Sequence, residues 1–251
     1  MKISIKLLPL IAALFTLSAC SDDEEEIVQE TPVETVTFSY EQGVFSGTAL
    51  PYRKAAISQQ PGEKAVLAIY LHGGSSKGSD NETQMGEAAI DSISGFLSQN
   101  KINSIMLVPQ CPKDKSWGGA MNIVLKSLID KYVAEGNVDT DRIYIFGGSM
   151  GGTGTWSMLS VFPSMFAAAM PVAGDPSGVN VENVSTTPVF TVMGTDDQIM
   201  DISKVSDVMT QLAALGADNI FETEEGWTHE MTCVQSYTKG RLAWVFSHSK
   251  Q

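Results

Sequence analysis

The stretch RIYIFGGSMGGTGTW, residues 142–156, constrains the fold more than any other part of the chain. Its β-branched and aromatic start is typical of a buried strand, and a helix is expected from about residue 150. Glycine is costly in regular structure, so five glycines between Gly147 and Gly154 need a structural reason. The spacing Gly147-x-Ser149-x-Gly151 between strand and helix is the pattern of a nucleophile elbow. The alternative, a glycine-rich phosphate loop, lacks the P-loop lysine and the spacing of a dinucleotide fingerprint.

Apolar runs alternate with helical patterns along the rest of the chain. This alternation predicts an α/β fold with a mostly parallel central sheet, helices on both faces and an antiparallel pair of strands at the N-terminal edge. The edge pair is expected at 35–40 and 52–58, and further strands at 64–74, 102–110, 142–147, 166–174, 188–194 and 219–225. Helices are expected at 82–100, 121–136, 150–161, 203–215 and 236–249. Ligands of such sheets lie at the carboxyl ends of the strands, so the residues that follow each strand matter most.

A nucleophilic serine needs a histidine base and an acid that orients it. In this fold the three residues run in the order serine, acid, histidine, and His229 follows the last predicted strand. Asp197, near the end of the strand at 188–194, is the favoured acid, with Asp175 and Asp196 as alternatives.

The other two histidines are expected to have different places. His72 opens an HGG turn after an earlier strand, and His248 is expected on the surface near the C-terminus. An HGG turn donates one backbone N–H to an oxyanion, and the residue after the nucleophile donates another. Gly74 and Met150 are therefore the expected donors.

The N-terminus has the form of a lipoprotein signal. Lys2 and Lys6 precede an apolar run that is short for a membrane span and ends in Leu17-Ser18-Ala19-Cys20. The ending resembles a bacterial lipobox, in which the chain is cut before a cysteine that takes lipid; the alternative is an ordinary signal peptide. The expected organisation is a signal peptide at 1–19, an acidic tether at 20–33 and a catalytic domain at 34–251.

The remaining two cysteines and the charge complete the sequence-based expectations. Cys111 and Cys233 both follow strands in an oxidising compartment, so either a disulfide or two buried free thiols is expected. The formal net charge of −13 argues against a nucleic-acid backbone as partner. The predicted chemistry needs neither a metal nor a cofactor.

Several segments together resemble a known family. LHGGSSKGSDN, VPQCPKDKSWGG, VDTDRIYIFGGSMGGTGTW, FPSMFAAAMPVAG and PVFTVMGTDDQIM resemble the bacterial predicted-peptidase or phospholipase/carboxylesterase-like branch of the α/β-hydrolases. That branch is similar to the feruloyl and acetylxylan esterases and to the polyhydroxyalkanoate depolymerases. The resemblance covers nearly all of 60–230 and implies Ser149, Asp197 and His229 as a catalytic triad. Relatives tend to carry a tryptophan shortly after the histidine, whereas here Trp227 precedes it.

Together with the lipobox-like N-terminus, the resemblance indicates a lipid-anchored serine esterase of the bacterial cell envelope, at the outer membrane or cell surface. Its expected substrate is a carboxylic ester, with feruloyl or acetyl esters on plant polysaccharide suggested by analogy alone. A serine peptidase of the same fold and a non-catalytic glycan-binding lipoprotein are the alternatives.

Overall fold

The computed structural model describes residues 35–250. The predicted signal peptide at 1–19, the predicted lipidation site Cys20 and the predicted tether at 20–33 lie outside the described residues, so the structure gives no account of them. Within 35–250, no helix combines the length and the apolar character that a membrane crossing requires.

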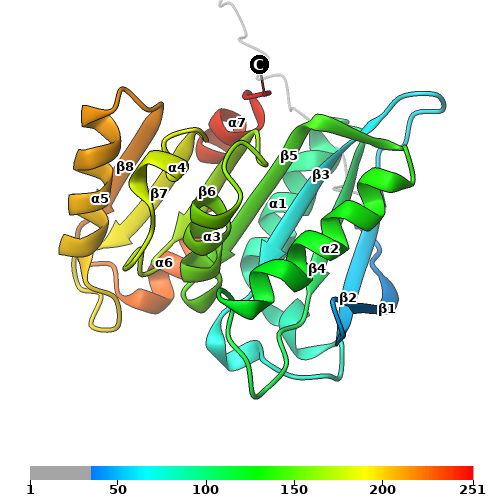
Figure 1. The fold of residues 1–251 in the computed structure, drawn as a ribbon, viewed down its shortest axis with the longest axis horizontal. Helices are drawn as coiled ribbons and strands as arrows, with labels where there is room; N and C mark the ends of the chain where they lie inside the picture. The colour runs from blue at the N-terminus through cyan, green and yellow to red at the C-terminus, as the bar shows by residue number, and fades with distance from the viewer. Residues whose placement is uncertain (1–34, 251) are drawn as a thin grey trace, which may run out of the picture. The chain divides into compact units, whose positions relative to one another are not determined.

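One sheet of eight strands organises the described part of the chain (Figure 1). Its spatial order is β1-β2-β4-β3-β5-β6-β7-β8. The strands are parallel from β4 through β8, and β1 and β2 are antiparallel to their neighbours at one edge. This confirms the predicted α/β architecture with its antiparallel edge pair. The bounds are β1 Ser39–Phe45, β2 Thr48–Ile57, β3 Ala65–Leu71, β4 Ser104–Pro109, β5 Val138–Gly148, β6 Ala168–Val172, β7 Val189–Gly194 and β8 Asn219–Glu224.

Helices cover both faces of the sheet (Figure 1). On one face α2 and α3 pack on β5, α3 also contacts α4, and α4 contacts α5. On the other face α1 contacts α6 and α7, and α7 also packs on β6 and β7. The bounds are α1 Ala88–Gln99, α2 Ala120–Ala134, α3 Met150–Val161, α4 Val181–Val184, α5 Ile202–Ala214, α6 His229–Gln235 and α7 Lys239–Phe246, with short 3₁₀ helices η1 Gly74–Ser76 and η2 Thr83–Gly86.

The central strands carry continuous apolar runs because helices bury them from both sides. Every residue of β3, β4, β6 and β7 is buried. Strands buried on both faces lose the polar-apolar alternation of a half-exposed strand, as the sequence runs indicated. The core therefore lies along the middle of the sheet and fixes the positions at which these strands end.

The first strand was placed wrongly by the sequence pattern. A strand was expected at 35–40, whereas β1 is Ser39–Phe45 and pairs with β2 from Ser39 opposite Lys54 to Phe45 opposite Thr48. Ser46 and Gly47 connect the two strands, and both have positive φ angles, 46° and 78°. A two-residue loop with this backbone is the favoured connection of a tight hairpin. The first strand therefore begins four residues later than expected, and the second begins four residues earlier, at Thr48 instead of residue 52.

The C-terminal helical region also differs from the expectation. One helix was predicted at 236–249, but the chain forms two helices, α6 at His229–Gln235 and α7 at Lys239–Phe246. Two threonines cap them: Thr228 accepts from the Met231 N–H, and Thr238 accepts from the Arg241 N–H. His229 consequently lies in the first turn of a helix rather than in a loop.

Candidate active site

Ser149 occupies the turn between β5 and α3. Its φ angle is 57°, in the left-handed region that residues other than glycine seldom adopt. The Ser149 N–H donates to the carbonyl of Val172 on β6, and the Ser149 carbonyl accepts from Thr153 within α3, both at 3.0 Å. The strained serine is thus held from both sides, as the elbow pattern predicts. Its hydroxyl lies at the carboxyl edge of the parallel strands.

Two glycines of the elbow are required by close backbone approach. A Cβ on Gly147 would overlap the carbonyl of Gly151, and a Cβ on Gly151 would overlap the carbonyl of Leu71 at the end of β3. A Cβ on Gly148 would instead make ordinary contacts of 3.5 Å with Cys233 Sγ and the Tyr70 hydroxyl. The glycines therefore allow α3 to start directly against two strands.

His229 reaches Ser149 from the start of α6. Its Nε2 lies 2.8 Å from Ser149 Oγ, and its Nδ1 lies 2.8 Å from Asp197 Oδ2. The side chain of His229 is 19% exposed, so it is mostly buried but still in contact with solvent.

Asp197 is the carboxylate that contacts this histidine. Its side chain is fully buried, and its second oxygen, Oδ1, accepts the backbone N–H groups of Ile199 and Met200 at 2.8 and 2.9 Å. An ionised carboxylate only accepts hydrogen bonds, so Nδ1 of His229 must carry its proton. Nε2 is then unprotonated and is free to accept the hydroxyl proton of Ser149.

The alternative acids point elsewhere. Asp175 forms a salt bridge of 2.8 Å with Lys204 and accepts from Ser177. Asp196 is exposed, and its backbone N–H donates to the carbonyl of Trp227 at 3.1 Å. Neither carboxylate contacts His229 in the described structure.

The other two histidines have separate contacts. His72 is buried; its Nε2 accepts the backbone N–H of Cys111 at 2.9 Å, and its Nδ1 therefore donates to the Gly73 carbonyl at 2.7 Å. Burial lowers the pKa of His72, and the neutral ring ties the end of β3 to the end of β4. His248, expected on the surface, has only 17% of its side chain exposed and lies 3.0 Å from Asp218.

The predicted oxyanion donors lie beside the elbow. Met150 is the first residue of α3, and Gly74 is the first residue of η1, so neither N–H has a partner within its own helix. Across residues 35–250, no other hydrogen bond engages either N–H. The preceding N–H, that of Gly73, donates to Glu87 Oε1 at 2.7 Å. A Cβ built on Gly73 would lie 3.7 Å from the Cβ of Ser149, so the HGG turn and the nucleophile are neighbours.

Of the two alternatives for Cys111 and Cys233, the structure has the free thiols and not the disulfide. Cys111 follows β4, whereas Cys233 Sγ packs beside Gly148 at the end of β5, and β3 lies between these strands. Two strand spacings amount to roughly 10 Å, beyond the 7 Å or so that a disulfide bridges between Cα atoms. Burial is the main cause that raises the pKa of Cys111 to about 11 and of Cys233 to about 12.

Three side chains next to this site were not predicted from the sequence. Glu87 contacts the HGG turn, Tyr70 donates to Glu87 at 2.7 Å, and Cys233 Sγ lies 3.9 Å from Nε2 of His229. Glu87 stood inside a predicted helix at 82–100, yet it occupies the break between η2 and α1. These residues belong to no recognisable sequence motif. They lie close together only because β3, β5, α1 and α6 pack against one another in the folded structure.

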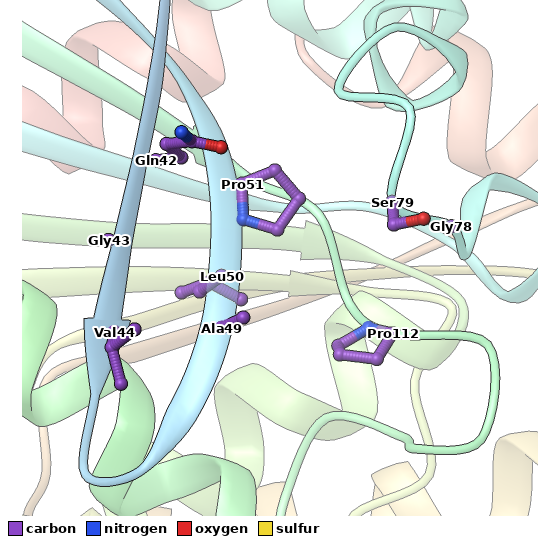
Figure 2. A pocket seen from close by; sticks show the side chains of 9 residues that line it. All are labelled: Gln42, Gly43, Val44, Ala49, Leu50, Pro51, Gly78, Ser79 and Pro112. Atoms are coloured by element: carbon purple, nitrogen blue, oxygen red, sulfur yellow. The ribbon is translucent and has the colours of Figure 1, made fainter.

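A groove of about 690 Å³ opens along the antiparallel edge of the sheet (Figure 2). The β1–β2 hairpin forms one side of it, and Ser79 and Pro112, from the loops after β3 and β4, lie on the opposite side. None of Ser149, Asp197 and His229 lines it. Between residues 35 and 250, no cluster of three or more histidine, cysteine or acidic side chains is arranged to hold a metal ion.

Parts of this chain are similar in sequence to known proteins. The model of the prolyl oligopeptidase family matches residues 125–180, which contain β5, the elbow and α3. The bifunctional acetylxylan esterase/xylanase XynS20E of Neocallimastix patriciarum is 34% identical over 100 residues, 38% of this chain and 13% of that protein. The chain therefore spans a small part of the length of this curated relative.

Two solved structures resemble nearly all of the described fold. A thermostable esterase superposes with a TM-score of 0.75 at 26% identity, over 85% of this chain and 63% of the other. The chain belongs to the α/β-hydrolases. The feruloyl esterase module of Clostridium thermocellum shares the fold of this α/β-hydrolase with a TM-score of 0.67 at 14% identity, over 86% of this chain and 90% of the module.

Proposed function

We propose that this α/β-hydrolase is a serine hydrolase that cleaves carboxylic esters. The observation that carries the proposal is the hydrogen-bonded chain from Ser149 Oγ through His229 to the buried Asp197. Two backbone N–H groups, those of Met150 and Gly74, stand beside the serine without partners among the described residues. A nucleophile, a base, an orienting acid and an oxyanion site are the parts that acyl transfer requires.

The reaction follows from these positions. Ser149 Oγ attacks the ester carbonyl carbon while its proton passes to Nε2 of His229, and Asp197 stabilises the resulting imidazolium. The N–H groups of Met150 and Gly74 bind the oxyanion of the tetrahedral intermediate. His229 then gives its proton to the departing alkoxide, which leaves an acyl-enzyme. Water activated by His229 releases the acid and restores the Ser149 hydroxyl.

The proposed substrate class is an ester carried on polysaccharide, with an acetyl or feruloyl acyl group. Its support is the sequence similarity to an acetylxylan esterase/xylanase and the shared fold with a feruloyl esterase module. Hydrolysis of p-nitrophenyl acetate, butyrate and octanoate and of methyl ferulate would define the acyl preference. A preference for octanoate over the acetyl and feruloyl esters would contradict this substrate class.

A peptidase is the second candidate, because the family model matching residues 125–180 describes prolyl oligopeptidases. The decisive comparison is between an ester and an amide of the same acyl group, p-nitrophenyl acetate and p-nitroacetanilide. The esterase proposal expects turnover of the ester alone, together with fluorophosphonate labelling that disappears in Ser149→Ala. Efficient amide cleavage would favour the peptidase, and absence of both labelling and turnover would favour a non-catalytic glycan-binding protein.

We also propose that Cys20 carries a lipid that holds the enzyme at the bacterial cell envelope, at the outer membrane or cell surface. The support is the sequence alone, which ends its apolar run in Leu17-Ser18-Ala19-Cys20. Labelling with an alkyne analogue of palmitate should mark the wild-type chain and spare Cys20→Ser, which should leave the membrane fraction and remain active. A wild-type chain that takes no label and is cleaved elsewhere would contradict the anchor.

A further inference from the structure

Glu87 makes three hydrogen bonds immediately behind the oxyanion loop, which we define as residues 73–76. Its Oε1 accepts from the Gly73 N–H and from Ser76 Oγ, each at 2.7 Å. Its Oε2 accepts from the Tyr70 hydroxyl, also at 2.7 Å. One carboxylate therefore joins both ends of the oxyanion loop to strand β3, which carries Tyr70.

Gly73 lies between this carboxylate and the nucleophile. A Cβ built on Gly73 would be 3.4 Å from Glu87 Oε1 and 3.7 Å from the Cβ of Ser149. The Gly73 N–H is directed at Glu87, and the next N–H along the chain, that of Gly74, has no partner among the described residues. The carboxylate thus determines which of two consecutive N–H groups is left for an oxyanion.

Tyr70 holds the carboxylate from the protein interior. The Tyr70 side chain is buried, and its ring packs edge-to-face against Tyr237 with centroids 6.0 Å apart. Burial is the main cause that raises the pKa of Tyr70 well above its ordinary range, so the phenol stays protonated and donates. The Tyr70 hydroxyl, which does not ionise, therefore holds the Glu87 carboxylate from the buried side of the oxyanion loop.

From this geometry we propose that Glu87 is a positioning residue, which orients the oxyanion loop so that the Gly74 N–H faces the tetrahedral intermediate formed on Ser149. The proposal rests on the esterase function proposed above. It assigns Glu87 no contact with substrate and no proton transfer. Oxyanion donors act through placement fixed before the reaction, so a carboxylate that fixes the loop contributes mainly in the transition state.

The test compares Glu87→Ala and Glu87→Gln with wild type and with Glu82→Gln. Glu82 is a matched control, because it lies in the same connection but accepts from the exposed Tyr40 hydroxyl at 2.9 Å. Glu87→Ala should lower kcat for p-nitrophenyl acetate about 100-fold, near the loss of one oxyanion donor, with KM changed less than about twofold. Glu87→Gln keeps one acceptor oxygen for the loop and should lose less than about tenfold. Glu82→Gln should match wild type.

A second measurement separates positioning from folding. A trifluoromethyl ketone adds to Ser149 Oγ at its carbonyl carbon while His229 takes the hydroxyl proton, which gives an adduct with an oxyanion. Its inhibition constant should rise across the Glu87 variants in proportion to the fall in kcat/KM, because both report oxyanion binding. Melting temperatures are recorded in parallel, and all rates are taken well below them. If Glu87→Ala does not fold, Tyr70→Phe removes one bond to the carboxylate and should lower kcat in the same way.

Three outcomes would overturn the proposal. They are a kcat within about twofold of wild type in Glu87→Ala, a loss confined to KM, and a trifluoromethyl ketone affinity that stays constant while kcat falls. For Tyr70→Phe, an unchanged kcat counts against the proposal in the same way. Failure of the esterase function itself would look different, because wild type would then show neither ester turnover nor labelling by a fluorophosphonate.

Discussion

Ser149 Oγ lies 2.8 Å from Nε2 of His229, although 80 residues separate the two in the chain. The serine stands on the turn after β5, and the histidine stands at the start of α6 after β8. Parallel strands place both positions at the same edge of the sheet. The proposed chemistry depends on this pairing, and the first prediction tests it.

Replacement of Ser149 by alanine should lower kcat on the order of 10⁶-fold and leave the fold intact, because the nucleophile is lost without any change in packing. His229→Ala should have a similar effect. His248→Ala is the matched control and should turn over ester at the wild-type rate, since that ring contacts Trp244 and Asp218 instead. Steady-state kinetics and circular dichroism check these outcomes. Near-normal turnover in Ser149→Ala would contradict the proposed mechanism, in which Ser149 is the nucleophile.

Asp197→Asn should reduce kcat on the order of 10⁴-fold, because an amide at this position favours the wrong tautomer of His229. Asp175→Asn and Asp196→Asn should be mild, since neither carboxylate contacts the imidazole. Measuring kcat for all three variants tests the assignment. A severe defect in Asp175→Asn combined with a mild one in Asp197→Asn would show that the acid is misassigned.

Two adjacent glycines should differ sharply in their tolerance of alanine. Gly147→Ala would force a Cβ against the carbonyl of Gly151 and should destabilise the fold by at least about 3 kcal/mol. Gly148→Ala meets only ordinary contacts with Cys233 and Tyr70 and should cost far less. Urea unfolding of both variants makes the comparison. Equal losses of stability would contradict the close packing of the elbow.

Stability should fall as the pH drops below the ordinary pKa of histidine, partly because of His72. Burial holds the pKa of His72 below its usual value of about 6.5, so below that pH the unfolded chain binds more protons than the folded chain. The stabilisation is complete above about pH 6.5 and declines by at most about 1.4 kcal/mol per pH unit until the folded pKa is reached.

The pH prediction is checked by unfolding free energies at pH 7.5 and 5.5 for wild type and His72→Gln. Glutamine does not titrate, so the variant should lose less stability than wild type over this interval. Equal losses would mean that His72 takes up its proton in the folded protein as readily as in the unfolded chain.

Both cysteines of the domain should react as free thiols after denaturation. With Cys20 replaced, the denatured and unreduced chain should show two reactive thiols, and a reductant should change neither the melting temperature nor the activity. In the folded protein both thiols should react slowly, because burial raises their pKa values to about 11 for Cys111 and about 12 for Cys233. A thiol count of zero before reduction would reinstate the disulfide.

Local sequence patterns predicted the structure correctly where it depends on the ends of strands and on close backbone contacts. The elbow around Ser149, the HGG turn and the buried central strands follow from glycine spacing and apolar runs. The start of α6 at His229 was missed, because a helix of seven residues capped by Thr228 has too few apolar positions to show a period. The sequence left a disulfide and two free thiols open for Cys111 and Cys233, because chain order does not reveal that β3 lies between β4 and β5.

Glu87 has its role only in the folded structure. Its three donors come from β3, the HGG turn and η1, and its own position is a break between two helices. A lone glutamate in a helical pattern is ordinarily a solvated residue. Only the tertiary arrangement distinguishes it from Glu82, which lies five positions earlier in the same connection.

The carboxylate of Asp197 has a consequence for how such an enzyme could be remodelled. Its Oδ1 is held entirely by backbone N–H groups two and three positions further along the same turn. The orientation of the Asp197 carboxylate toward the imidazole is therefore set by a short segment of main chain. It needs no side chain from another element. A designer can therefore change other loops at this edge of the sheet without disturbing the orientation of the acid, provided that this turn is kept intact.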